Sequence, residues 1–339
     1  MIKSEAALES ALATPDAELV SLFRRLDGDL IILGANGKMG LSLGALAVRA
    51  REAAGGDQRI YAVSRFSEAG AVERARALGM IPMRCDLLDR SAIAQLPAVP
   101  NVLYLAGRKF GTIGSEPQTW ASNVLIPAAV GEHFPHSRVV VFSTGCVYPL
   151  MPSTSTGCDE STPPAPVGEY AQSCMGRERI FEYFCDSAKT AVCLYRLNYS
   201  VDLRYGALFD IATKIWHGQP VDISVSTFNV VWQGDANRYA LHALELASTP
   251  AARLNVTGPE RLQTRQVAET FGTLMNKPVT FTGTAGSLNY LSDASECHRR
   301  FGAPHISADT LIRLQAEWIM RGLPTLDRPT HFEVTSGAY

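Results

Sequence analysis

The sequence has no long hydrophobic run, no block of basic residues and no closely paired cysteines. No apolar segment approaches the roughly 18 residues of a membrane-spanning helix, and residues 1–10 lack the apolar core of a signal peptide. The formal net charge of −2, without any Lys/Arg block, does not indicate nucleic acid or an anionic membrane as a partner. We therefore expect a cytoplasmic protein whose partner is a small molecule.

The seven cysteines are scattered and odd in number, and no CxxC spacing occurs among them. This pattern is typical of reduced thiols rather than of a disulfide framework or a zinc site, and we expect no metal. What the chain does have is an ordinary globular composition, with 46% hydrophobic and 19% charged residues. Its 339 residues suit one large α/β unit or two domains.

A glycine-rich stretch follows the first apolar run of strand length. Residues 30–33 are Leu-Ile-Ile-Leu, and Gly34, Gly37 and Gly40 come directly after them. Residues 41–48 then have the composition of a helix. A strand, a glycine turn and a helix start together form a pyrophosphate site, because the backbone approaches closely and the helix N-terminus favours negative charge. The alternative is an ordinary strand-to-helix turn, but the flanking elements favour the dinucleotide site.

Apolar strands and helices alternate along the first two thirds of the chain. Thr14 as N-cap and Pro15 predict a helix before the first strand. Further strands are expected at 59–63, 80–84, 101–106, 138–142 and 191–195, separated by helices at 68–78, 116–134 and 168–187. Continuous apolar strands separated by helices indicate a parallel sheet covered on both faces.

The regular alternation of strands and helices weakens after residue 198, where short strands mix with helices. We predict an N-terminal helical extension (1–28), a dinucleotide-binding domain (29–197), a smaller α/β substrate lobe with segments returning to the sheet (198–321), and a tail (322–339). The tail has no periodicity and is expected to lie along a neighbour or to be loose.

Ligands of such sheets bind beyond the carboxyl ends of the strands. An NAD site places Asp or Glu after the second strand, whereas this chain has Ser64 and Arg65. An arginine pairs with the 2′-phosphate of NADP, so we favour NADP over NAD; the alternative is an exposed arginine at a strand end. Asp86 follows the third strand and is expected near the adenine, and the small residues Ala106 and Gly107 follow the fourth.

A hydroxyl at the end of the fifth strand, Thr144, and a tyrosine at the start of the next long helix, Tyr170, form a candidate acid/base pair. From spacing alone, Tyr170 is equally explained as a packing residue.

Several motifs occur in an order that resembles the extended short-chain dehydrogenases/reductases, also called the NAD-dependent epimerase/dehydratase family, over residues 29–321. They are Gly34-x-x-Gly37-x-x-Gly40, Asn123-Val124, Ser143-Thr144-x-x-Val147-Tyr148, Tyr170 with Glu178, and Arg196-Leu197. The resemblance implies a Rossmann-type doubly wound fold and an NAD(P)-dependent oxidoreductase or epimerase. It further implies Tyr170 as proton donor/acceptor, Thr144 as hydrogen-bond donor to the substrate oxygen, and a homodimer through helices 116–134 and 168–187.

On this basis the cofactor-binding residues are predicted to be Gly34, Asn36, Gly37, Lys38, Met39, Gly40, Ser64, Arg65, Asp86, Leu87, Leu105, Ala106, Gly107, Asn123, Ser143, Tyr170 and Arg196. The substrate-binding residues are predicted to be Arg108, Lys109, Thr144, Cys146, Asn198 and Arg204.

One departure from the family lies at Cys174, where the motif Tyr-x-x-x-Lys has its lysine. In the family that lysine binds the nicotinamide ribose and lowers the pKa of the tyrosine, so Tyr170 is expected to titrate near the free value of about 10. Three interpretations are open. Another cation substitutes, namely Arg177, Arg108 or Lys109; or the enzyme is slow or alkaline-shifted in oxidation; or the chain binds cofactor without turnover.

A second departure follows Arg196, where the Tyr-Gly-Pro element of many nucleotide-sugar enzymes is missing. Asn198, Arg204 and Tyr205 suit hydroxyls and an anionic group, so we expect a free sugar, sugar acid or lactone as substrate. The alternatives are a cofactor-binding regulatory or sensor protein and a nucleotide-sugar epimerase/dehydratase.

Overall fold

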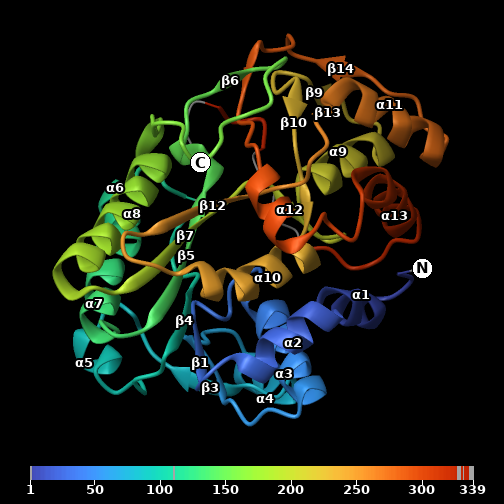
Figure 1. The fold of residues 1–339 in the computed structure, drawn as a ribbon. Coiled ribbons are helices and arrows are strands. Elements are labelled where there is room, and N and C mark those ends of the chain that lie inside the picture. Colours follow the sequence, from blue (N-terminus) through green and yellow to red (C-terminus); the bar gives the residue numbers. More distant parts are fainter. Residues whose placement is uncertain (1, 110, 327–329, 331, 336–339) are drawn as a thin grey trace.

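The structure is a computed structural model that describes residues 2–109, 111–326, 330 and 332–335. Its centre is a sheet of seven parallel strands in the order β12-β7-β5-β4-β1-β2-β3 (Figure 1). The strands are β1 (Leu30–Leu33), β2 (Ile60–Ser64), β3 (Ile81–Arg84), β4 (Asn101–Tyr104), β5 (Arg138–Thr144), β7 (Ala191–Leu197) and β12 (Ala252–Val256). The predicted Rossmann-type doubly wound α/β fold is confirmed.

Helices cover both faces of the sheet, as Figure 1 shows. Along β1, Leu30 and Ile32 join the hydrophobic core on one face and Ile31 and Leu33 the core on the other, because successive side chains of a strand alternate. The first face is covered by α2 (Ala17–Arg25), α3 (Gly40–Ala54), α4 (Ala71–Ala77) and α10 (Gln233–His242). The second is covered by α5 (Arg90–Ile93), α7 (Ile126–His133) and α8 (Gly168–Ala188).

The predicted helix 116–134 is present in three parts: α6 (Glu116–Trp120), a π-helical turn (Ala121–Leu125) and α7. A 3₁₀ turn (Ala243–Leu246) continues α10.

The strand order reverses between β1 and β4. From β1 the chain moves outward to β2 and β3, and then returns to the other side of β1 as β4. Leu33 pairs with both Val63 and Tyr104, so the loops that begin at Gly34 and Leu105 leave the sheet side by side. This edge is where ligands of such sheets bind.

A second core lies beyond the carboxyl edge of the sheet. It is built from α9 (Ala207–Trp216), α11 (Thr264–Met275) and α13 (Ala308–Met320), with α12 (Ser295–Phe301) beside β12. Two-stranded pieces complete it: β8 (Ser200–Val201) with β11 (Val231–Trp232), β9 (Val221–Asp222) with β14 (Phe281–Thr282), β10 (Thr227–Phe228) with β13 (Leu262–Gln263), and β6 (Met151–Pro152) with β15 (Leu288–Asn289). Two elements from the second half of the chain return to the main sheet: strand β12 pairs with β7 at its edge, and helix α10 packs on one face.

The N-terminal region differs from the sequence expectation. The N-cap of α2 is Asp16, whose carboxylate accepts from the Leu19 N–H at 2.7 Å, so Thr14 as N-cap is wrong. An earlier helix, α1 (Glu5–Leu12), was not predicted. Leu8 and Leu12 lie one turn apart on it and are fully buried in the second core, so packing rather than its short length stabilises this helix. Among the described residues, none of the helices has the length and apolar character to cross a membrane.

Candidate active site

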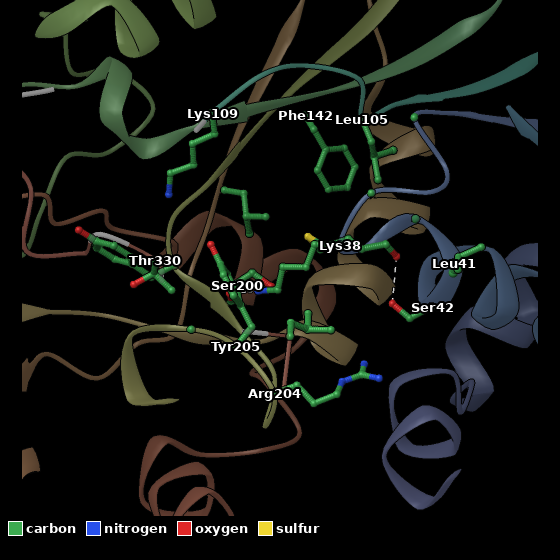
Figure 2. Close-up of a pocket in the computed structure, with 18 of the residues that line it drawn as sticks. Lys38, Leu41, Ser42, Leu105, Lys109, Phe142, Ser200, Arg204, Tyr205 and Thr330 are labelled. Carbon is green, nitrogen blue, oxygen red and sulfur yellow. Dashed lines mark hydrogen bonds between the residues drawn. The ribbon is translucent and has the colours of Figure 1, made fainter. Parts of the chain in front are cut away.

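A cavity of about 640 Å³ lies between the carboxyl edge of the sheet and the second core (Figure 2). Its walls come from the glycine loop, the ends of β5 and β7, the start of α8, the segment after β7, and both terminal regions of the chain. The predicted site residues on it are Gly34, Asn36, Gly37, Lys38, Met39, Gly40, Leu105, Lys109, Ser143, Thr144, Cys146, Tyr170, Asn198 and Arg204. The fold thus brings most of the predicted catalytic and phosphate-binding residues to one place.

The glycine loop has the geometry that a pyrophosphate requires. Gly34 has a φ of +93°, and a Cβ there would lie 2.7 Å from the backbone nitrogen of Ala106, so only glycine fits. A Cβ on Gly40 would lie 2.4 Å from the carbonyl oxygen of Ala35. Helix α3 starts at Gly40 and no side chain caps it, so its first amide groups are available to an anion. The cavity and this loop fit a dinucleotide.

Lys38 reaches from the glycine loop across the cavity. Its Nζ donates to the Ser200 carbonyl at 2.8 Å and lies 4.2 Å from the centre of the Tyr205 ring. Burial lowers the pKa of Lys38 to about 8, and the charge of Lys109 adds to this decrease. Lys109 also lines the cavity, and burial lowers its pKa as well. Two lysines therefore provide positive charge beside the glycine loop.

Tyr170 and Thr144 also line the cavity, and their side chains contact each other. The hydroxyl of Tyr170 forms hydrogen bonds with the Thr144 side chain and with the thiol of Cys174. Burial raises the pKa of Tyr170 well above its usual value, and the nearby charge of Arg177 only partly offsets this. The expected pKa near 10 is therefore too low, and the phenol is neutral at neutral pH.

Cys174 lies behind Tyr170 and does not reach the cavity. Its side chain is fully buried against Val147, Tyr148 and Cys158. Burial raises the pKa of the Cys174 thiol, so this position provides no charge in place of the motif lysine.

Arg177 is the cation nearest to this pair on the same helix face as Tyr170 and Cys174. Its Nη1 donates to the Phe142 carbonyl at 2.7 Å and its Nη2 to Asn123 Oδ1 at 2.6 Å. The charge of Arg177 lowers the pKa of both Tyr170 and Cys174. Of the other candidate cations, Lys109 lines the cavity, whereas Arg108 lies outside it and donates to the Gly111 carbonyl at 2.8 Å.

Asn123 and Gly107 contact Arg177 and the loop after β4, and they do not line the cavity. Asn123 accepts from the Arg108 N–H at 2.8 Å and donates to the Arg108 carbonyl at 2.9 Å. A Cβ on Gly107 would lie 2.2 Å from Arg177 Nη2. Neither residue lines the cavity, so their prediction as cofactor contacts is not supported by its geometry.

Arg196 was predicted to bind the cofactor, and the structure corrects this. Its Nε and Nη2 donate to the two carboxylate oxygens of Glu178 at 3.0 and 2.7 Å, and its Nη1 donates to the Tyr148 hydroxyl at 2.7 Å. Ser143 donates to the same carboxylate at 2.5 Å. Because these buried partners occupy the guanidinium, Arg196 ties β7 to α8 and does not line the cavity.

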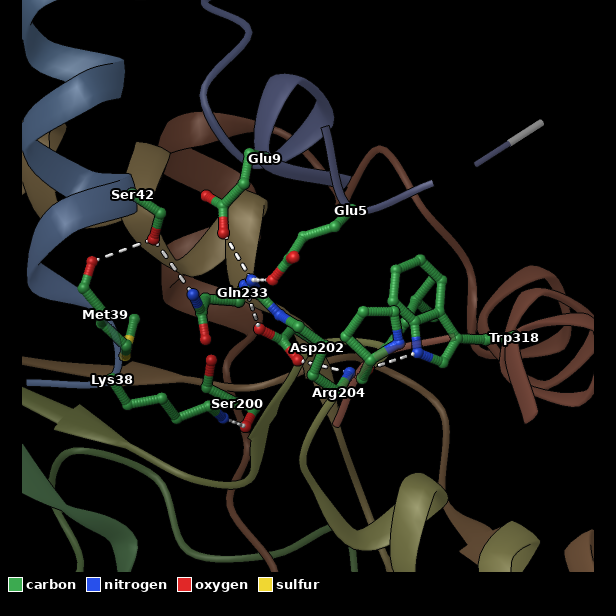
Figure 3. A network of polar contacts seen from close by, with 12 residues as sticks. Glu5, Glu9, Lys38, Met39, Ser42, Ser200, Asp202, Arg204, Gln233 and Trp318 are labelled. Atoms are coloured by element: carbon green, nitrogen blue, oxygen red, sulfur yellow. Dashed lines mark hydrogen bonds and ion pairs between the residues drawn. The ribbon is translucent and has the colours of Figure 1, made fainter. Parts of the chain in front are cut away.

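Arg204 lines the cavity, but its charge is already neutralised (Figure 3). The guanidinium lies 3.1 Å from carboxylate oxygens of Asp202 and Glu5, and it also pairs with Glu9. The three carboxylates around the guanidinium disfavour the expected binding of an anionic substrate group by Arg204. Glu5 and Glu9 line the cavity too, so α1 contributes to a site to which the sequence analysis assigned no N-terminal residue.

The adenosine end of the dinucleotide was expected at the carboxyl ends of β2 and β3. Arg65 is exposed and Ser64 half-buried; neither lines the cavity, whereas Glu68 and Arg74 do and form an ion pair at 3.3 Å. The Asp86 carboxylate is exposed and accepts from the Leu88 N–H at 3.0 Å. Leu87 packs in the hydrophobic core and Ala106 lies against Gly34, so both residues contact other parts of the protein.

The sequence analysis missed several residues of the site. They are Glu5, Glu9, Glu68, Arg74, Tyr199, Ser200, Leu326, Thr330 and Phe332. Glu5 and Glu9 lie on α1, Arg74 lies on α4 and Ser200 on β8, and the others lie in loops or in the C-terminal segment. Their places on the cavity depend on contacts between distant segments, so no local pattern marks them. Among the described residues, no group of three or more His, Cys, Asp or Glu side chains is arranged to hold a metal ion.

The strand order, the glycine loop and the Tyr170–Thr144 pair define a Rossmann-type dinucleotide-binding protein of the short-chain dehydrogenase/reductase kind. The model of the NAD dependent epimerase/dehydratase family matches residues 30–248, and the chain belongs to this family. The predicted family, and with it membership of an enzyme family, is confirmed.

Solved structures of this kind share the fold at low sequence identity. UDP-glucuronic acid 4-epimerase from Bacillus cereus, in complex with NAD, is 16% identical with a TM-score of 0.71, over 86% of this chain and 99% of that one. UDP-glucose 4-epimerase from Thermus thermophilus, with NAD, is 18% identical with a TM-score of 0.68, over 85% and 98%. dTDP-glucose 4,6-dehydratase from Bacillus anthracis, with NAD, is 14% identical with a TM-score of 0.70, over 87% and 97%. No curated protein sequence matches the chain.

Proposed function

We propose that the chain is an NAD(P)-dependent oxidoreductase that acts on a carbonyl or carbinol carbon of a sugar-like or sugar-acid molecule. The observation that carries this proposal is the hydrogen bond between Tyr170 and Thr144 on a cavity that the glycine loop also lines. A bound nicotinamide dinucleotide supplies hydride chemistry, and Gly34, Gly37 and Gly40 with the start of α3 would hold its pyrophosphate. The NAD-bound epimerases and the dehydratase with this fold support the class.

The protonation state of Tyr170 favours reduction of a carbonyl. A neutral phenol donates a proton to the oxygen of the substrate, and Thr144 hydrogen-bonds the same oxygen. Removal of a proton from an alcohol requires the phenolate, which the raised pKa of Tyr170 disfavours below alkaline pH. We therefore infer that reduction is the favoured direction at neutral pH and that oxidation is alkaline-shifted.

The test is turnover of a panel of sugars, sugar acids and lactones, with the reduced nicotinamide followed by its absorbance. Stoichiometric consumption of the cofactor supports the oxidoreductase. Conversion without net consumption indicates an epimerase or dehydratase. Tight cofactor binding without turnover of any compound indicates the sensor protein, which the buried, uncharged Cys174 favours as the second candidate.

We propose NADP(H) as the preferred cofactor. Arg65 is exposed directly after β2, and no carboxylate stands at positions 64 or 65 to repel a 2′-phosphate. The nearby Glu68 is already paired with Arg74.

Replacing Arg65 with alanine should weaken NADP binding while leaving NAD binding unchanged. A hydrogen-bonded charged group contributes about 1.5–3 kcal/mol, which corresponds to a Kd about 10- to 100-fold higher. Isothermal titration with both dinucleotides measures the effect. Arg76→Ala, an exposed arginine on α4 away from the cavity, is the matched control. Equal losses for NAD and NADP, or an initial preference for NAD, would contradict the assignment.

We propose that Arg177 partly replaces the charge of the motif lysine. Its guanidinium is fixed by Phe142 and Asn123, and its charge lowers the pKa of Tyr170. The replacement is incomplete because burial has the larger effect and raises the pKa.

The Cys174→Lys variant should move the oxidative pH–rate profile to lower pH. An ammonium group beside the phenol favours phenolate, and such a neighbour lowers a pKa by about 1–3 units. Cys174→Met introduces similar bulk without charge, and separates the electrostatic effect from overpacking of this buried position. If the lysine and methionine variants have the same profile, the missing charge does not limit Tyr170.

We also propose a homodimer through α6, α7 and α8. Leu125, in the π-helical turn between α6 and α7, is 61% exposed; Tyr183 on α8 is 62% exposed and Trp120 on α6 is 37% exposed. A set of exposed apolar side chains of this kind is typical of an interface.

A further inference from the structure

The C-terminal segment lies in the cavity. The Leu326 N–H donates to the Arg204 carbonyl at 3.2 Å, and the Trp318 Nε1–H donates to the Pro324 carbonyl at 2.9 Å, which directs the chain back from α13. Thr330 and Phe332 are only 5% and 3% exposed. Leu326, Thr330 and Phe332 all line the cavity. The expectation that the tail is loose or lies along a neighbour is therefore wrong for the described residues.

Thr330 anchors this segment to α9. Its N–H donates to Asp210 Oδ2 at 2.9 Å, and its hydroxyl donates to the same oxygen. The Phe332 N–H donates to Thr330 Oγ1 at 3.2 Å. Figure 2 shows Thr330 on the side of the cavity away from Leu41 and the start of α3.

Phe332 and Val334 continue the segment toward the acid/base pair. The Tyr199 hydroxyl donates to the Phe332 carbonyl at 3.4 Å, and the ring of Phe332 lies 5.8 Å from that of Phe228. Val334 packs against the hydrophobic cluster that includes Cys146, Ala171 and Tyr290 and that Tyr170 also contacts. We call Leu326, Thr330, Phe332 and Val334 the C-terminal wall.

The wall limits the space that remains for a substrate. Sites for drug-sized ligands measure about 300–1,000 Å³. Ser64, Arg65 and Asp86 do not line the cavity of about 640 Å³, so the nicotinamide half of a dinucleotide would share it with the substrate. The wall bounds this shared space on the side away from the start of α3. Asp210 and Glu333 add carboxylates behind the wall, which disfavours a diphosphate there.

We infer that the C-terminal wall determines substrate specificity and restricts the site to small hydroxy or carbonyl compounds that carry no nucleotide. The inference rests on the proposed function, because it takes the glycine-loop side of the cavity as the dinucleotide site. The wall lies outside residues 30–248, which the family model matches.

The first experiment measures how well the wall shields a bound cofactor. NADPH fluorescence is quenched with acrylamide in the full-length protein and in Phe332→Ala, Val334→Ala and Met320→Ala. Phe332→Ala should raise the quenching constant, and Val334→Ala, a milder change at a half-buried position, should raise it less. Met320→Ala removes an exposed side chain near the end of α13 and should leave it unchanged. Circular dichroism confirms that each variant is folded.

The second experiment is calorimetric titration of the NADPH-bound full-length protein with UDP-glucose and UDP-glucuronic acid, because in the free protein these compounds would compete for the dinucleotide site itself. We expect no saturable binding of either compound. Micromolar binding of either compound would overturn the inference, and so would unchanged quenching in both wall variants while NADPH remains bound. If NADPH fails to bind the unmodified chain, the proposed function is overturned. If NADPH binds and a nucleotide sugar binds beside it, only the inference about the wall is overturned.

Discussion

Tyr170→Phe should lower the rate of carbonyl reduction by about 10²–10⁴-fold, the usual contribution of a positioned proton donor. The change removes only the hydroxyl that contacts Thr144 and Cys174 and keeps the ring that packs in the buried cluster. Affinity for the dinucleotide should change little, because the change leaves the glycine loop and the start of α3 intact. Steady-state kinetics give kcat, and titration with NADPH gives the cofactor Kd.

Tyr183→Phe is the matched control for this variant. Tyr183 lies on the same helix, α8, and is 62% exposed, away from the cavity. Its hydroxyl should have no effect on kcat. A Tyr170→Phe protein with unchanged kcat would show that another group donates the proton. The pH dependence provides a second check, because the raised pKa of Tyr170 keeps the donor form present through neutral pH and the reductive rate should fall only as alkaline pH removes that proton.

Glu178→Ala should destabilise the fold by about 3–5 kcal/mol, the usual cost of removing one partner of a buried ion pair. Glu178 is fully buried and accepts from Arg196 with both carboxylate oxygens, and it also accepts from Ser143. Without it the Arg196 guanidinium stays charged in an interior with few other acceptors, and β7 loses its tie to α8. Urea denaturation followed by fluorescence measures the free energy of unfolding.

Two further variants make this prediction specific. Asp309→Ala breaks the exposed Asp309–Arg313 pair on α13 and should cost no more than about 1 kcal/mol. Replacing Glu178 and Arg196 together with methionine removes both buried charges and should recover much of the loss. If Glu178→Ala costs no more than Asp309→Ala, the buried pair does not stabilise the fold in the way we describe.

The local patterns were sufficient for the central features of the fold. The apolar runs of β1, β5 and β7 predict buried parallel strands, because a strand covered on both faces is apolar at every position. Three glycines between a strand and a helix predict a tight turn against an anion, because only glycine accepts the close contacts with Ala35 and Ala106. The alternation of strands and helices also predicted Tyr170 at the start of the long helix that follows the strand ending at Thr144.

The interaction partners of the charged side chains could not be predicted from the sequence. Arg196 and Arg204 resemble ligand-binding residues until their partners are known, and those partners lie up to 48 and up to 199 positions away along the chain. An arginine is the same in sequence whether it meets a phosphate or a carboxylate, and only the folded chain decides which.

What the sequence by itself determined was the sheet, the glycine turn and the family, because each depends on spacing within a few residues of chain. The tertiary structure decided the rest. It placed α1 and the C-terminal wall at the cavity, neutralised Arg204 with Glu5 and Glu9, and brought Arg177 rather than a lysine near Tyr170. These contacts join segments far apart in the chain, and their energies depend on distance in space, which no local pattern encodes.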